Sequence, residues 1–175
     1  MKKKKFTKIR ENITEVEYQK LLTYLNGKED LTTNTKNNLR RTFILLYFTG
    51  MRVNEVKQLK VKDINTIFEK EELIIVTHKT RKERKLFFSK EAIKQIKKHF
   101  VFNDNSKDED FIITTKGNPL RTPSSSTFIA KVNSFIQEVL GHRYSSHSFR
   151  AGIITDMSKS INPKFIKEFI GHSDI

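Results

Sequence analysis

The sequence has 175 residues, of which 36% are hydrophobic, so it can bury one substantial core but has little room for a second full domain. Its 34 Lys and Arg against 20 Asp and Glu give a formal net charge of +14, which indicates a polyanionic partner, most commonly nucleic acid. A basic surface that serves solubility alone is the alternative. The absence of cysteine excludes disulfides, thiolate metal sites and cysteine nucleophiles.

No stretch of the sequence approaches the roughly 20 consecutive apolar residues that a membrane-spanning helix needs. The basic residues at the start are followed by mostly polar ones, so the apolar core of a secretory signal is missing. We therefore expect a protein without a membrane partner, located in the cytoplasm.

The N-terminal part of the chain predicts two helices separated by a loop. The first helix begins after Thr14, which forms a capping-box pattern with Glu17, and ends at Gly27 in a left-handed conformation. Its predicted apolar stripe consists of Val16, Leu21, Leu22 and Leu25. Residues 28–38 are rich in Asn and Thr and predict a loop. Residues 39–48 are almost continuously apolar and predict a helix at the centre of the core.

The rest of the chain predicts a small sheet among further helices. Residues 51–59 resume a helical pattern after the break at Thr49-Gly50. Residues 72–78 and 84–88 predict the strands of a hairpin with a cationic tip. The remaining predicted elements are a helix over 90–101 capped by Ser89, a short strand over 111–113, and helices over 127–140 closed by Gly141, over 147–159 capped by Ser146, and over 163–170. The predicted fold class is α+β, mainly α, with a small antiparallel sheet.

Four short motifs follow one another along the chain. They are Arg52 after a glycine turn with Glu55 three residues later, Lys79 at the hairpin tip, the H-x-x-R motif of His147 and Arg150, and the sequence Ile170-Gly171-His172. In order and separation they resemble the motifs of the tyrosine recombinases, the phage integrase family. The resemblance covers nearly the whole chain and implies the catalytic-domain fold of that family over residues 14–175, preceded by a basic segment, 1–13.

The resemblance implies site-specific recombination or integration, in which double-stranded DNA is cleaved and rejoined through a 3′-phosphotyrosyl intermediate. Cleavage places extra negative charge on the nonbridging phosphate oxygens, and the paired donors of Arg52 and Arg150 suit that charge. Lys79 is the candidate general acid for the leaving 5′ oxygen. His147 is a candidate for proton transfer or a phosphate contact, and His172 for another phosphate contact.

Glu55 is expected to support Arg52 structurally rather than to act as an acid or base. The chemistry needs no cofactor, and the histidines lack acidic neighbours at the spacing of metal ligands, so we expect no metal site. The resemblance implies that the complete protein assembles as a tetramer on DNA, whereas we expect this chain by itself to be monomeric.

The family's nucleophilic tyrosine follows the Gly-His motif within about three helical turns, but this sequence ends at Ile175, three residues after His172. Its four tyrosines all precede that point: Tyr18, Tyr24, Tyr47 and Tyr144. We therefore expect the nucleophile to lie beyond Ile175, the family's N-terminal DNA clamp also to lie outside these residues, and the chain by itself to be inactive in cleavage. A catalytically silent DNA-binding protein is the main alternative, and an RNA-binding module is a more distant one.

Overall fold

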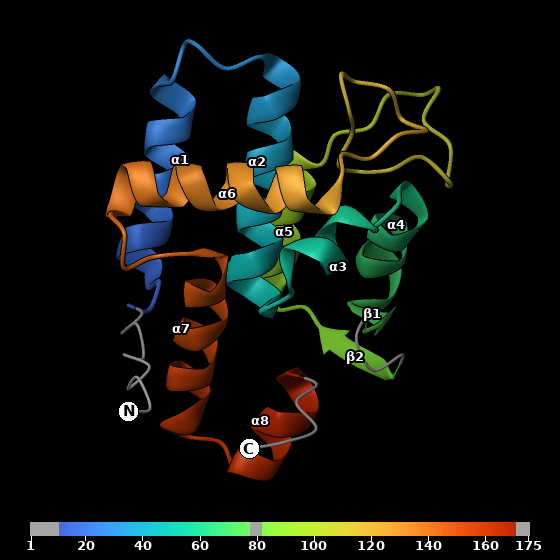
Figure 1. Ribbon diagram of the computed structural model, residues 1–175. Coiled ribbons are helices and arrows are strands. Elements are labelled where there is room, and N and C mark those ends of the chain that lie inside the picture. The colour runs from blue at the N-terminus through green and yellow to red at the C-terminus, as the bar shows by residue number, and fades with distance from the viewer. Residues whose placement is uncertain (1–10, 78–81, 171–175) are drawn as a thin grey trace, which may run out of the picture.

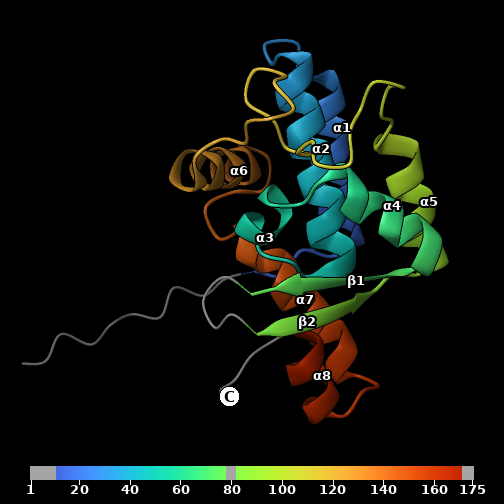
Figure 2. The same cartoon turned by 90° about the vertical axis from the view of Figure 1, so that its right-hand side faces the viewer.

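A computed structural model describes residues 11–77 and 82–170 as helices packed around a central helix, with a two-stranded hairpin on one side (Figures 1 and 2). The helices are α1 (Glu15–Gly27), α2 (Thr33–Thr49), α3 (Val53–Lys57), α4 (Val61–Lys70), α5 (Lys90–His99), α6 (Ser125–Leu140), α7 (Ser146–Ser158) and α8 (Pro163–Ile170). The strands β1 (Glu72–Val76) and β2 (Glu83–Phe87) are antiparallel, with Glu72 opposite Phe87. The predicted class, mainly α with a small antiparallel sheet, is confirmed.

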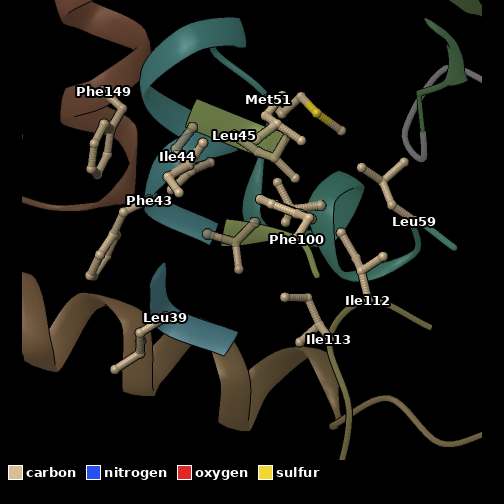
Figure 3. Close-up of a cluster of buried hydrophobic side chains, with 14 of the residues drawn as sticks. Leu39, Phe43, Ile44, Leu45, Met51, Leu59, Phe100, Ile112, Ile113 and Phe149 are labelled. Carbon is tan, nitrogen blue, oxygen red and sulfur yellow. The ribbon is translucent and has the colours of Figure 1, made fainter. Parts of the chain in front are cut away.

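Helix α2 forms the centre of the core, as predicted from its continuous apolar run. It lies against α1, α3, α5 and α7. Phe43, Ile44 and Leu45 are fully buried, and Figure 3 shows them between Phe149 of α7 on one side and Phe100 on the other. Because α3 and α7 both pack on this helix, its position sets the distance between them.

The predicted loop before α2 is wrong in its second half, because the helix begins at Thr33. The Thr32 side chain caps the helix by accepting a hydrogen bond from the Thr35 backbone N–H at 3.2 Å. The side chains of Asn34 and Asn38 donate to the carbonyl oxygen of Thr114, at 3.0 and 2.8 Å. These contacts with a distant loop offset the low helix propensity of asparagine, so tertiary structure extends the helix beyond its apolar part.

Helix α1 has the predicted capping box at Thr14 and ends at the predicted residue. Two details of the prediction are wrong. Val16 is 60% exposed, because the inward face of the helix carries Tyr18, which stacks on Tyr47 with ring centroids 4.0 Å apart. Gly27 does not adopt a left-handed conformation, and the extended residue Lys28 terminates the helix instead.

Helix α4 occupies a stretch for which no element was predicted. Its buried residues are Val61, Ile64 and Ile67, which recur at the helical spacing. The predicted strand over 111–113 is absent from the described structure, where Phe111 forms only an isolated bridge with Lys60 at the start of α4. Ile112 and Ile113 instead fill the core (Figure 3).

The other predicted elements lie close to their expected positions. The ends of β1, β2, α5, α6 and α8 each fall within two residues of the prediction. Ser89 caps α5 by accepting from the Ala92 backbone N–H, and Gly141 closes α6 with φ of 96°. No helix in residues 11–77 and 82–170 is both long and apolar enough to cross a membrane.

The segment before α1 is held against α7 at a close backbone contact, which gives a test of the packing. The Ile13 N–H donates to the Ser148 carbonyl at 3.0 Å, and a Cβ added at Gly152 would lie 2.4 Å from the carbonyl oxygen of Ile13. We expect Gly152→Ala to lower the free energy of unfolding by about 1–3 kcal/mol, because backbone must shift to accept the methyl group.

Urea denaturation measures this loss, and Gly27→Ala is the matched control. A Cβ at Gly27 meets nothing within 4 Å and its φ is not positive, so this change should be neutral or stabilise by up to about 1 kcal/mol. Equal effects of the two substitutions would contradict the close contact at Gly152.

Candidate functional site

The segments that begin α3 and α7 meet at a cavity of about 270 Å³. Its polar lining comes from Arg52, Asn54, Glu55, Ser146, His147 and Arg150, and its apolar lining from Met51, Val53 and Ile129. A water molecule takes about 30 Å³ of the liquid, so the cavity has room for a tetrahedral anion such as a phosphate group.

The turn between α2 and α3 places Arg52 at this cavity. Gly50 ends α2 in a left-handed conformation with φ of 62°, and its N–H donates to the Leu46 carbonyl at 3.0 Å. Arg52 is the N-cap of α3, one residue before the helix and not inside it as predicted, and its N–H donates to Glu55 Oε2 at 2.7 Å. Its guanidinium lies 3.1 Å from Glu55 Oε1. Glu55 therefore fixes both the backbone and the side chain of Arg52.

Helix α7 presents His147 and Arg150 one turn apart. The predicted cap at Ser146 is wrong, since Ser145 is the N-cap and donates its N–H to Ser148 Oγ at 3.0 Å. Ser146 is the first residue of the helix, and its N–H donates to Asn133 Oδ1 of α6 at 2.8 Å. This contact with α6 orients the first turn of α7, where His147 is exposed. Arg150, one turn later, is only 6% exposed.

The Arg150 guanidinium is held by two backbone carbonyls. Nη1 donates to the Gly50 carbonyl at 2.8 Å, and Nη2 donates to the Ile170 carbonyl at the end of α8. Burial lowers the pKa of Arg150 to about 9, with further lowering by the charges of Arg52 and Arg84, and Glu55 opposes the shift. Arg150 is therefore protonated at neutral pH, and a bound anion would stabilise its charge.

Arg84 of β2 is a third arginine of this cluster, which the sequence analysis did not select. Its side chain is 2% exposed, and Nη2 lies 3.0 Å from Glu55 Oε2. Burial lowers the pKa of Arg84, while Glu55 opposes the shift. Alternation along the strand was the available signal, because Arg84 shares the inward face with Leu86.

Two guanidiniums thus pair with the Glu55 carboxylate, and the Arg150 guanidinium lies within its electrostatic influence, so positive charge is in excess at this site. Planar guanidiniums suit the oxygens of a phosphate. Among the residues that the structure describes, no group of three or more His, Asp or Glu side chains could hold a metal ion. The arrangement favours an anion bound by arginine.

The structure brings three of the five predicted catalytic residues together: Arg52, His147 and Arg150 line one cavity, with Glu55 beside them. The other two, Lys79 and His172, lie outside the described residues.

Ile175, beyond which the nucleophilic tyrosine is expected, also lies outside the described residues, so the position of the nucleophile stays a prediction. The described structure ends at Ile170, whose carbonyl contacts Arg150. At the hairpin, it ends at Thr77, whose N–H donates to the Lys82 carbonyl at 2.9 Å. The segments that carry His172 and Lys79 therefore each start from a residue with a defined backbone contact.

Known proteins are similar to this chain in sequence over most of its length. The family model for the phage integrase family matches residues 11–175. A tyrosine recombinase from Agathobacter rectalis is 30% identical over 146 residues, which cover 80% of this chain and 46% of that protein. The tyrosine recombinase XerA from Pyrococcus horikoshii is 26% identical over 165 residues, or 94% of this chain and 53% of that protein.

Solved structures show the same fold. A crystal structure of XerA recombinase superposes with a TM-score of 0.66 at 17% identity, covering 93% of this chain and 56% of that one. The Tn1549 transposon integrase, solved in complex with circular intermediate DNA, gives a TM-score of 0.67 at 17% identity over 94% of this chain and 58% of that one.

The mainly helical domain, with its small sheet beside the arginine cluster, therefore has the fold of tyrosine recombinase catalytic domains. The chain belongs to the phage integrase family. It spans about half the length of the curated relatives that it matches.

Proposed function

We propose that the protein containing this chain is a site-specific recombinase or integrase that breaks and rejoins double-stranded DNA. The observation that carries the proposal is the pairing of Arg52 and Arg150 at one cavity, held there by Glu55 and by the carbonyls of Gly50 and Ile170. Proteins with this fold have been solved on DNA, among them XerH site-specific recombinase bound to its palindromic difH substrate.

In the proposed reaction a tyrosine oxygen attacks the scissile phosphorus and the bond from phosphorus to the 5′ oxygen breaks. Arg52 and Arg150 donate to the nonbridging oxygens, where negative charge grows. His147, exposed at the cavity rim, assists proton transfer or contacts the phosphate, and His172 adds a phosphate contact. Lys79 protonates the leaving 5′ oxygen. The 3′-phosphotyrosyl bond conserves the energy for rejoining, so no cofactor takes part.

None of the four tyrosines of the sequence lines the cavity. Tyr18 stacks on Tyr47 in the interior, and Tyr24 donates its hydroxyl to Glu138 at 2.7 Å. Tyr144 packs against the core. We therefore expect the attacking tyrosine to follow Ile175, and the 175-residue chain alone to form no covalent adduct with DNA.

The test is a suicide substrate carrying the protein's own recombination site, incubated with the full-length protein and with the 175-residue chain. A mobility shift that survives denaturation, obtained with the full-length protein only, is the expected result. DNA binding by the full-length protein without any adduct would favour the silent DNA-binding alternative. An adduct formed by the chain alone would show that our assignment of the nucleophile is wrong.

The formal net charge of +14 leads to a second prediction, which concerns the affinity of the chain for DNA. We expect the chain to bind duplex DNA with little sequence preference, and log affinity to fall linearly with log salt by about 0.9 per phosphate neutralised. Fluorescence anisotropy over a salt series measures the slope. Affinity unchanged between about 50 and 200 mM salt would rule out a phosphate-dominated surface.

We further propose that the complete protein assembles as a tetramer on DNA, whereas this chain is a monomer. Light scattering after size-exclusion chromatography distinguishes the two states, with and without DNA.

A further inference from the structure

Arg84 is a buried charged group for which the proposed reaction has no role. Its relative exposure is 4%, it is absent from the lining of the cavity, and both of its terminal nitrogens are already bonded to protein oxygens. A buried arginine without a suitable counter-charge is strongly destabilising. The partners that stabilise the buried charge of Arg84 therefore indicate its structural role.

The two terminal nitrogens of Arg84 bind two different segments. Nη2 forms the ion pair with Glu55 of α3, and Nη1 donates to the Ile170 carbonyl at 2.8 Å and to the Phe169 carbonyl at 3.3 Å. The hairpin strand thereby joins α3 to the C-terminal end of α8. Figure 2 shows β2 next to α8, and their residues are in contact.

The contacts of Arg84 complete a closed series of contacts that includes Arg52, Glu55 and Arg150 of the cavity lining. Glu55 binds both Arg52 and Arg84, and the Ile170 carbonyl accepts from both Arg84 and Arg150. Arg150 closes the ring on the Gly50 carbonyl, two residues before Arg52. The two phosphate-binding candidates are thus connected on one side through the α2–α3 turn and on the other side through Arg84.

We propose that Arg84 is a positioning residue that fixes Arg52, through Glu55, and the end of α8, through Ile170, relative to Arg150. This inference rests on the proposed function for its effect on catalysis. Only a planar guanidinium presents two donor groups in a fixed plane, one toward the Glu55 carboxylate and one toward the Ile170 carbonyl. A lysine at this position keeps the charge but loses the fixed geometry.

The first experiment needs no DNA cleavage. Hydrogen exchange followed by mass spectrometry compares the wild-type chain with Arg84→Met, in which the contacts to Glu55 and Ile170 are removed. We expect exchange in residues 52–57 and 163–170 to accelerate by about tenfold or more, because their shared anchor is lost, while α1 and α6 keep their rates. The matched control is Lys85→Met, whose side chain is exposed on the opposite face of the same strand and pairs with Glu72. It should leave both segments unchanged.

Unchanged exchange in both segments of Arg84→Met would overturn the proposal. Exchange accelerated equally throughout the chain would also overturn it, since that is the signature of general instability. If Arg84→Met does not fold, Arg84→Lys takes its place, with smaller acceleration expected in the same two segments.

The second experiment measures the catalytic effect in the full-length protein, with single-turnover cleavage of the suicide substrate at saturating DNA. We expect Arg84→Lys to slow adduct formation by about tenfold or more while the Kd for DNA changes by less than about threefold. Arg84→Met should be slower still, and Lys85→Met should cleave at the wild-type rate. A loss that follows only the folded fraction or only DNA affinity would refute positioning.

The two proposals fail in different ways. If the wild-type protein forms no adduct, the proposed function fails, and hydrogen exchange still decides whether Arg84 joins the two segments. If the wild type cleaves and Arg84→Lys cleaves equally fast, the positioning role fails and the recombinase function stands.

Discussion

Arg150→Lys in the full-length protein should slow covalent adduct formation by about 10²–10³-fold. Lysine keeps the positive charge but cannot give a phosphate paired, planar hydrogen bonds while also holding the carbonyls of Gly50 and Ile170. The Kd for DNA should change by less than about threefold, because one phosphate contact among many contributes little to affinity. The rate is measured in single turnover with the suicide substrate, and the Kd by anisotropy.

Because Arg150 also holds two backbone segments together, the melting temperature of each variant must be measured alongside its rate. The control is Lys159→Met at the exposed end of α7, where Lys159 pairs only with Asp156 among the described contacts. Its rate should equal that of the wild type. An Arg150→Lys protein that is folded, bound to DNA and cleaves at the wild-type rate would remove Arg150 from the proposed mechanism.

Glu55→Gln should lower the free energy of unfolding by about 3–5 kcal/mol, the usual result of removing one partner of a buried ion pair. Glu55 is the only carboxylate that pairs with Arg52 and Arg84 among the described contacts, and its side chain is 3% exposed. Its loss leaves the Arg84 charge buried without a counter-charge. Guanidinium chloride denaturation of the chain measures the change.

Glu109→Gln is the matched control, because Glu109 also pairs with two cations, Lys60 and Lys62, but is 61% exposed. We expect it to change the free energy of unfolding by less than about 1 kcal/mol. The double variant Glu55→Gln, Arg84→Met should be more stable than Glu55→Gln alone, because it removes the unpaired charge as well. A loss for Glu55→Gln no larger than that for Glu109→Gln would contradict a buried network.

The sequence alone was sufficient for features that depend on local chemistry. The capping box of Thr14 and Glu17, the apolar run of α2 and the alternating residues of the hairpin each follow from contacts within a few residues. Motif order and spacing can also be read without coordinates and led to Arg52, Lys79, His147, Arg150 and His172, whose catalytic roles stay predictions. All five were predicted to line one cavity. The structure places Arg52, His147 and Arg150 there, and the other two lie outside the described residues.

The tertiary structure decided what depends on contacts between distant segments. The N-terminal turns of α2 exist because a loop around Thr114 accepts hydrogen bonds from Asn34 and Asn38. The apolar segment 111–113 enters the core and does not extend the sheet: Ile112 and Ile113 are fully buried, and the N–H groups of Phe111 and Ile112 donate to the carbonyls of Pro119 and Leu59.

Arg84 is the clearest example of a residue whose role could not be predicted from the sequence alone. Its own neighbours in sequence mark it as an inward-facing strand residue and nothing more. Its partners, Glu55 and the Ile170 carbonyl, are 29 and 86 residues away along the chain. A buried charge is stable only when a counter-charge and hydrogen-bond acceptors lie next to it. For Arg84, only the tertiary structure brings these partners together.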